Sequence, residues 1–263
     1  MKFALTSLAT LSLLAVTCLS VSTQAGVLMV QSYEMLDGKH PATENKIYVD
    51  KDRVRIETGS NPDQYFIYRS DKKIFWTVNL KDKSYMEMTE KDLEEMFAKV
   101  DEARKKMEAS MANMPPAQKE MMEKMMAKMM PAGANAPKTS YKKVGSGGTI
   151  NGWSTDKYEG TREGAKQSDI WTTLPKTMDV SASDYQVMLD MAKFFEKFAK
   201  NMEGMIGDHG KNGLDGIPVK TISYKDGKAS FQSEMKEVKK QNFATSLFEI
   251  PADLKKKELL KAK

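Results

Sequence analysis

Residues 67–89 read IYRSDKKIFWTVNLKDKSYMEMT, and apolar side chains alternate with polar ones along this stretch. Successive side chains of a β-strand point to opposite faces of a sheet, so this alternation is typical of strands with one buried face. The residues that share one face are Ile74, Trp76, Val78 and Leu80. The run Lys81-Asp82-Lys83 interrupts the pattern, and its residues are common in turns. The stretch therefore predicts strands joined by short turns.

The same period of two extends on both sides, from Gly26 to Thr89. The alternating pairs before the quoted stretch are Ile47/Val49, Val54/Ile56 and Phe66/Tyr68. The turn clusters between the runs are Asp50-Lys51-Asp52, Asn61-Pro62-Asp63 and Asp71-Lys72. These features predict an antiparallel meander of about six strands, with one apolar face and one face toward solvent.

At Thr89 the period of the apolar residues changes to that of a helix. Thr89 can cap this helix, with Asp92 three residues later as its capping-box partner. Pro115-Pro116 ends the helix, and a second amphipathic segment follows. We expect residues 90–131 to form a helical hairpin inserted between strands. Nine methionines lie between Met107 and Met130, which makes this hairpin methionine-rich.

Strand patterns resume near Tyr141 and continue to the C-terminal region. The clearest are residues 157–161, 168–173, 219–224 and 228–235. Asp226-Gly227 between the last two is a strong hairpin signal. A third helix is expected after Ser183, with Gln186 as its capping-box partner. Its apolar face comprises Met188, Met191, Phe195, Phe198, Met202 and Met205.

Together these patterns predict an α+β fold, in which helices cover the apolar face of a large antiparallel sheet. We expect a single domain over residues 26–254. The basic residues 255–263 are expected to form a frayed helical tail.

Residues 1–25 resemble a signal peptide, with Lys2 before an apolar stretch and a small-residue cleavage site ending at Ala25. The apolar stretch is too short for a stable membrane span, so we expect no transmembrane segment in the mature chain. Cys18, the only cysteine of the chain, lies inside this segment, where it is expected to be discarded without lipidation. The mature chain would then form no disulfide. We expect an exported protein of the periplasm of a Gram-negative bacterium.

The formal net charge is +5, but lysines alternate with acidic residues throughout the chain. This pattern is typical of a solvated surface and argues against nucleic-acid binding. The two histidines, His40 and His209, have neither metal-ligand spacing nor a neighbouring nucleophile. Gly145-Ser146-Gly147-Gly148 lacks the rest of a phosphate-binding motif and is expected to be a plain loop. We therefore expect no enzyme, no cofactor and no histidine- or cysteine-based metal site.

The methionine-rich segment leaves three interpretations open. Its methionines could be the buried face of a helix, they could line a groove for a hydrophobic ligand, or their thioethers could bind Cu(I) or Ag(I). The ligand groove would also use phenylalanines of the third helix. The candidate ligand-binding residues are Met121, Met122, Met125, Met126, Met129, Met130, Phe194, Phe195 and Phe198.

Three segments resemble a domain-of-unknown-function family of secreted bacterial proteins. They are residues 45–59 (NKIYVDKDRVRIETG), 67–89 and 244–259 (ATSLFEIPADLKKKEL), and a Met-rich "MPPAQ" segment at residues 114–118 is also seen in some members. That family is similar in fold to the periplasmic lipoprotein carriers LolA and LolB. The resemblance implies an incomplete antiparallel barrel wrapped over helices, with an apolar interior able to hold acyl chains. It assigns no role to an individual residue.

These observations predict a periplasmic, non-enzymatic binding or carrier-like protein for a lipid or another hydrophobic small molecule. A soft-metal binding protein and a cell-envelope scaffold without a ligand remain the alternatives.

Overall fold

The computed structural model describes residues 25–111, 114–115, 118–121, 139–199 and 213–258. Its strands are β1 Gly26–Met35, β2 Thr43–Asp50, β3 Arg53–Thr58, β4 Gln64–Arg69, β5 Ile74–Asn79, β6 Ser84–Thr89, β7 Ser140–Ile150, β8 Trp153–Arg162, β9 Ala165–Thr173, β10 Ile217–Lys225, β11 Lys228–Gln241 and β12 Lys255–Lys257. The helices are α1 Glu90–Met111 and α3 Ala182–Ala199, with short 3-10 turns at η1 Pro175–Met178 and η2 Thr245–Phe248.

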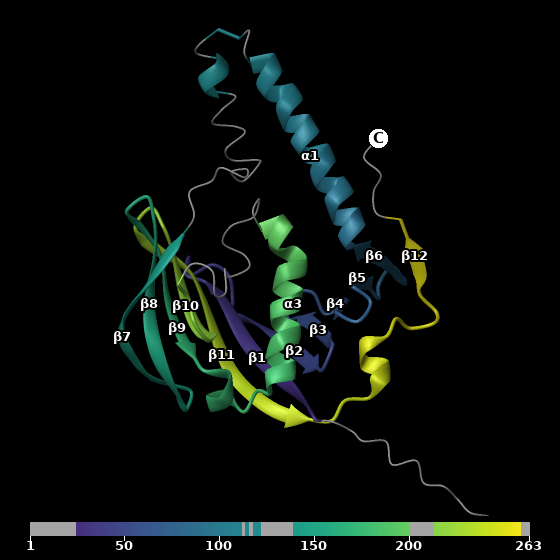
Figure 1. Cartoon of the computed structure of the whole chain (residues 1–263), viewed down its shortest axis with the longest axis vertical. Coiled ribbons are helices and arrows are strands. Elements are labelled where there is room, and N and C mark those ends of the chain that lie inside the picture. Colours follow the sequence, from purple (N-terminus) through teal and green to yellow (C-terminus); the bar gives the residue numbers. More distant parts are fainter. Residues whose placement is uncertain (1–24, 112–113, 116–117, 122–138, 200–212, 259–263) are drawn as a thin grey trace, which may run out of the picture.

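Within the described residues, the strands form a single sheet of 12 strands in the order β12-β6-β5-β4-β3-β2-β1-β11-β10-β9-β8-β7. Neighbouring strands are antiparallel except β12 and β6, which run parallel. The sheet is open, with β12 and β7 at its two edges, and it curves around α3 (Figure 1). The prediction of a large antiparallel sheet in an α+β fold is confirmed, although the described part of the chain has few helices.

The six strands predicted before Thr89 are all present as β1–β6. Their short turns place lysines in the left-handed region, with φ of 54° at Lys51, 52° at Lys73 and 46° at Lys83. At Asp226-Gly227, φ is 52° and 73°, as the predicted two-residue hairpin turn requires. Turn residues in the sequence therefore located the strand ends correctly.

Strand β1 joins the two halves of the sheet, because it pairs with β2 on one side and with β11 on the other. Its first residue, Gly26, lies so close to the backbone of β2 that an added Cβ would stand 2.3 Å from the carbonyl oxygen of Val49. A side chain at this position would force the two strands apart. Strand β1 therefore begins with a glycine immediately after the predicted cleavage site.

The glycine-rich residues 145–148 lie within β7 and not in the loop that the sequence predicted. Register shifts between Lys143 and Gly145 and between Ser146 and Gly148 show that the strand is bulged there. Gly145 and Gly148 have φ of 146° and 74°, which glycine adopts without a side-chain clash. The loop prediction failed because bulged strands and loops share this composition.

The sheet strands β2–β5 are packed on both faces. On the concave face, Val54 and Tyr68 pack against Leu93 of α1 and against α3. On the outer face, Ile67, Trp76 and other side chains pack against Phe248, which is fully buried. The prediction of one solvated face is therefore wrong for these strands. The segment between β11 and β12, residues 242–254, crosses the outer face and covers it (Figure 1). It is called the covering segment below.

Helix α1 begins with the predicted capping box. The Asp92 amide donates to Thr89 Oγ1 over 3.1 Å, and the Thr89 amide donates back to Asp92 Oδ2 over 2.8 Å. After α1 ends at Met111, residues 118–121 are helical, as expected for the start of the second helix. The rest of the predicted hairpin, residues 122–131, lies outside the described residues, so the hairpin stays a prediction.

The basic tail is a strand where it is described, and not the frayed helix that the sequence predicted. Lys255–Lys257 form β12, which pairs with Ser84–Met86 of β6. Lys256 also forms an ion pair with Glu87 at 2.7 Å, and Lys257 lies 3.2 Å from Asp82. Pairing with an open sheet edge therefore determines the conformation of this segment.

Candidate functional site

The candidate site is an apolar cavity between α3 and the concave face of the sheet, with a volume of about 350 Å³. The helix and the sheet both contribute its walls. The lining residues are Ile47, Ile56, Phe66, Phe75, Tyr185, Met188, Leu189, Met191, Ala192, Phe195, Gly216, Ile217 and Pro218. Almost all lining atoms are carbon or sulfur, so the cavity suits an apolar molecule.

The spacing of residues along α3 brings one of its faces to the cavity. The cavity-lining residues of α3 recur at steps of three or four along the chain, and a helix places such residues on one side. They include Tyr185, Met188, Leu189, Ala192 and Phe195. Strand alternation does the same for the sheet, where every second residue of a strand points toward α3. The helical period of α3 and the strand period of the sheet together therefore determine which side chains face the cavity.

The sequence predicted Ser183 as the N-cap of α3. In the structure, Ser181 caps the helix instead. The Asp184 amide donates to Ser181 Oγ over 3.1 Å, and Ser181 Oγ donates to Asp184 Oδ2 over 2.5 Å. The cap thus lies two residues earlier than predicted, and Asp184, not Gln186, is the side chain that bonds the capping serine. Two overlapping Ser-x-x-acceptor patterns made the sequence ambiguous here.

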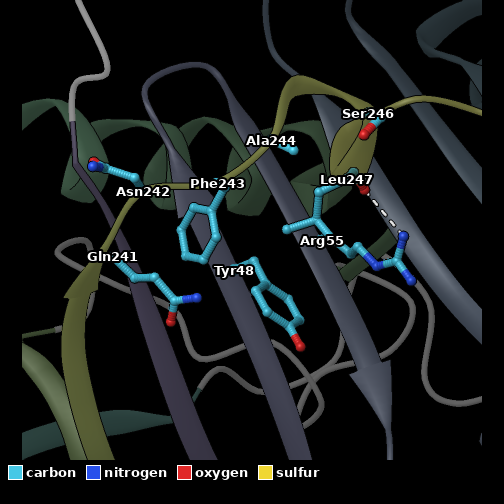
Figure 2. A pocket seen from close by; sticks show the side chains of 8 residues that line it. All are labelled: Tyr48, Arg55, Gln241, Asn242, Phe243, Ala244, Ser246 and Leu247. Atoms are coloured by element: carbon cyan, nitrogen blue, oxygen red, sulfur yellow. Dashed lines mark hydrogen bonds between the residues drawn. The ribbon is translucent and has the colours of Figure 1, made fainter.

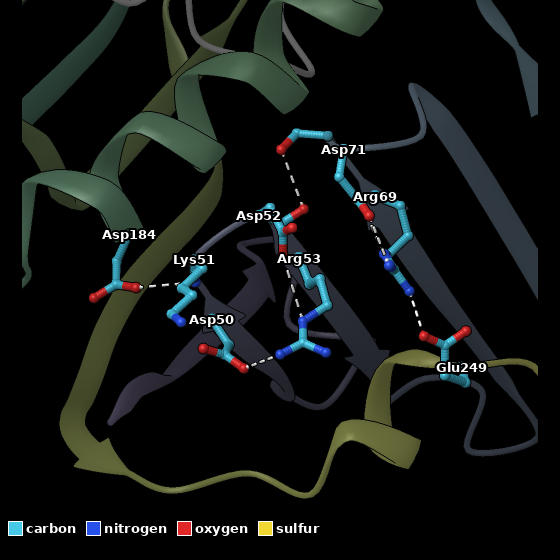
Figure 3. A network of polar contacts seen from close by, with 9 residues as sticks. Asp50, Lys51, Asp52, Arg53, Arg69, Asp71, Asp184 and Glu249 are labelled. Atoms are coloured by element: carbon cyan, nitrogen blue, oxygen red, sulfur yellow. Dashed lines mark hydrogen bonds and ion pairs between the residues drawn. The ribbon is translucent and has the colours of Figure 1, made fainter. Parts of the chain in front are cut away.

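Buried polar contacts fix α3 and the covering segment to the same region of the sheet (Figure 3). Asp184 Oδ1 accepts a hydrogen bond of 3.4 Å from the backbone amide of Lys51, in the β2–β3 turn. Asp50 and Arg53 form an ion pair of 2.5 Å beside it. Farther along, Arg69 bonds Asp71 at 2.7 Å and also pairs with Glu249 of the covering segment. The position of the cavity wall therefore depends on the β2–β3 turn.

The three predicted phenylalanines of α3 have different surroundings. Phe195 lines the cavity and meets the Phe75 ring edge to face, with centroids 4.8 Å apart. Phe194 is buried and packs against Tyr68, with the two ring centroids 5.5 Å apart. Phe198 belongs to α3, but its side chain lies outside the described residues. One predicted phenylalanine is thus placed directly in the lining.

Of the six predicted methionines, only Met121 belongs to the described residues, and its side chain is 69% exposed. Met122, Met125, Met126, Met129 and Met130 lie outside them, so their role in a ligand groove or a Cu(I) site stays a prediction. The methionines of the cavity are Met188 and Met191. Sequence periodicity had placed both on the apolar face of the third helix without assigning them to a site.

Sequence reasoning missed the sheet side of the cavity. Ile47, Ile56, Phe66 and Phe75 come from four different strands. Alternation placed Ile47, Ile56 and Phe66 on apolar strand faces, whereas Phe75 lies on the face opposite to the one predicted from Ile74, Trp76 and Val78. The chain also carries no local signal for which buried residues pack closely and which surround a cavity. That distinction depends on where α3 crosses the sheet.

A second depression lies on the outer face, beside the start of the covering segment (Figure 2). Two of its polar side chains, Tyr48 and Arg55, are already engaged. Tyr48 donates to Glu57 over 3.0 Å, and burial together with this carboxylate raises the pKa of Tyr48 to about 12. Arg55 donates to Glu57 and to the carbonyl oxygen of Leu247, each over 3.0 Å, and stacks on Tyr65. These contacts hold the covering segment in place, so the depression is the weaker candidate for a ligand site.

Within the described part of the chain, no group of three or more His, Cys, Asp or Glu residues is placed to hold a metal ion. His40 lies in an exposed turn, 3.0 Å from Asp37, and His209 lies outside the described residues. No helix in that same part of the chain is both long enough and apolar enough to span a membrane.

The family described as "Domain of unknown function (DUF4412)" matches residues 96–254. No curated protein matches the chain. Among similar solved structures, an uncharacterized conserved protein from Thermus thermophilus has a TM-score of 0.44 and 10% identity, over 90% of this chain and 92% of that one.

Two further solved structures are similar to the chain. MucB in the complex of Pseudomonas aeruginosa MucA/MucB is similar with a TM-score of 0.39 and 10% identity, over 88% of this chain and 58% of that one. A LolA superfamily protein from Nitrosomonas europaea is similar with a TM-score of 0.30 and 6% identity, over 87% of this chain and 91% of that one.

Proposed function

The chain belongs to the DUF4412 family, and we propose that it is a binding or carrier-type protein whose ligand is an acyl chain or a similar hydrophobic molecule. The ligand would occupy the cavity between α3 and the concave face. The observation that carries this proposal is a cavity of about 350 Å³ whose lining is almost entirely apolar. Its volume is within the range of roughly 300–1,000 Å³ that is common for small-molecule sites.

The chemistry of the lining supports this ligand class. Met188 and Met191 are flexible, and their thioethers adapt to apolar ligands of varied shape. The rings of Phe66, Phe75 and Phe195 supply large apolar surfaces. Water inside such a cavity would find few hydrogen-bonding partners, so an apolar ligand would displace it favourably.

The proposal places the protein in the periplasm and gives it no catalytic activity. The predicted signal peptide at residues 1–25 supports export, and the sheet begins at Gly26 directly after it. Val27, the next residue, is fully buried, so β1 enters the core immediately after the predicted cleavage site.

Substitution of a cavity residue by a larger one tests the proposal. The mature protein would be titrated with a fluorescent long-chain fatty alcohol, alongside Ala192→Phe, which fills the cavity. The matched control is Ala229→Phe at an exposed position of β11. We expect at least tenfold weaker binding for Ala192→Phe, unchanged binding for Ala229→Phe, and no loss of stability in either.

Equal binding by Ala192→Phe and by the unsubstituted protein would overturn this location of the site. Should Ala192→Phe fold poorly, Met188→Phe tests the same wall with a smaller increase in volume. Mass spectrometry of organic extracts of the purified protein would identify a lipid retained from the cell.

A further inference from the structure

The lining of the cavity carries no positive charge and very few polar groups. None of its residues is lysine, arginine or histidine, so it offers no cationic partner to an anionic ligand. The only hydroxyl among the lining side chains is that of Tyr185. Within the described residues, this hydroxyl has no hydrogen-bond partner in the protein, which leaves it available to a ligand.

The carboxylate of Asp215 acts electrostatically on this hydroxyl. Asp215 directly precedes the lining residue Gly216 and is itself exposed. Burial of the phenol raises the pKa of Tyr185, and the negative charge of Asp215 raises it further. Tyr185 is therefore a neutral hydrogen-bond donor at physiological pH, next to a negative charge.

Two positive features near this region are already in use. The Lys143 ammonium bonds Asp156 at 2.7 Å, and this contact raises the pKa of Lys143, with a smaller rise from the charge of Asp215. The N-terminus of α3, which could attract an anion, is capped by Ser181 and Asp184. An anionic ligand would thus meet a carboxylate at the cavity and no cationic side chain in its lining.

Resting on the proposed function, we infer that the site selects hydrophobic molecules whose polar end is uncharged, such as a long-chain alcohol or ester, and discriminates against the free fatty acid. Tyr185 would donate a hydrogen bond to the alcohol or ester oxygen. Asp215 would repel an ionised carboxylate, and burying such a group without a partner is costly.

The test compares three ligands with the same alkyl chain, namely hexadecanol, methyl hexadecanoate and hexadecanoate. Each would displace a fluorescent fatty alcohol from the mature protein at pH 8, where the acid is ionised. We expect the alcohol and the ester to bind at least tenfold more tightly than the acid. Asp215→Asn should reduce this ratio, because it removes the repulsion and leaves only the cost of burying the carboxylate. Tyr185→Phe should weaken the binding of the alcohol and the ester, because both lose a hydrogen-bond donor.

Asp226→Asn is the control, because it removes the same charge from an exposed turn and should leave the ratio unchanged. If all three ligands bind equally well, the inference about the polar end is overturned while the proposed function stands. If none of them binds, both are overturned. A ratio that Asp226→Asn lowers as much as Asp215→Asn would also contradict the inference, since it would show an effect of net charge alone.

Discussion

The two faces of strands β2–β5 differ in how they are covered. The outer face is closed by the segment after β11, whose Phe248 is fully buried among rings and aliphatic side chains. Arginines anchor this segment, as Arg55 bonds the Leu247 carbonyl oxygen and Arg69 pairs with Glu249. The concave face is closed by α3, whose contact with the sheet leaves a cavity lined in part by methionine. The outer face is thus closed by the packing of Phe248, while the concave face retains an apolar cavity under α3.

The cavity on the concave face is expected to lower the stability of the fold. A protein interior is normally close-packed, and a cavity loses the contacts that its walls would otherwise make. The apolar core on the outer face of the same strands offsets this loss of stability. An ion pair between Arg69 and Glu249 lies beside that core. Substitutions on the two faces should therefore affect stability and binding separately.

The largest effect on stability is expected from Phe248→Ala. Truncating a fully buried phenylalanine lowers the free energy of unfolding by about 3–5 kcal/mol. Urea unfolding followed by tryptophan fluorescence measures this loss. Ligand affinity of the folded fraction should remain within twofold, and a tenfold loss of affinity would show that the two faces are not separable.

A matched pair of isoleucines compares the faces directly. Ile67 is fully buried on the outer face, whereas Ile56 is partly buried and lines the cavity. We expect Ile67→Ala to cost about 2–5 kcal/mol of unfolding free energy, and Ile56→Ala to cost less than half as much, because the cavity is already present at that site. Equal losses in urea unfolding would contradict the contrast.

The two helix caps form a second pair. Removing a capping side chain costs about 1 kcal/mol, so Asp92→Ala should destabilise the protein by roughly this amount and Asp184→Ala by more. Only Asp184 also bonds the β2–β3 turn, through the Lys51 amide. Ligand affinity should therefore fall in Asp184→Ala and remain unchanged in Asp92→Ala, as measured by fluorescence titration.

The smallest effect concerns pH. The Arg69 guanidinium holds the pKa of Asp71 below its ordinary value of 3.8. Because the pKa is lowered in the folded state, this contact stabilises the protein above the unfolded pKa, and its contribution disappears as the pH falls through the lowered value. Asp71 is partly exposed, so the contribution is under about 1 kcal/mol. The stability difference between the unsubstituted protein and Asp71→Asn should be constant from pH 8 to pH 6 and shrink below about pH 4.

Much of the sheet could be read from the sequence because its signals are local. Alternation at Val54/Ile56 and turn residues such as Lys51 and Asp226-Gly227 located strands and hairpins, and Thr89 with Asp92 located the start of α1. The covering of the outer face was missed, since Phe248 is far along the chain from the strands that it covers. Long-range contacts of this kind leave no periodic signal.

The sequence predicted the residue types of the candidate site better than its position in the fold. The sequence indicated an apolar site lined by methionine and phenylalanine of the helices, and Phe195 does line the cavity with Met188 and Met191. The role of the doublets between Met121 and Met130 remains a prediction. Tyr185 and Asp215 carried no signal, because an isolated tyrosine and an isolated aspartate are common on helices and in loops.

Nuclear magnetic resonance of methionine methyl groups tests the central claim most directly, because it observes the cavity and the methionine-rich segment in one experiment. The protein labelled at its methionine methyl groups would be titrated with hexadecanol. We predict saturable shifts for the methyl groups of Met188 and Met191, while Met235, buried in the neighbouring core, remains unchanged. Shifts confined to the methionines between Met107 and Met130, with Met188 and Met191 unaffected, would contradict the account.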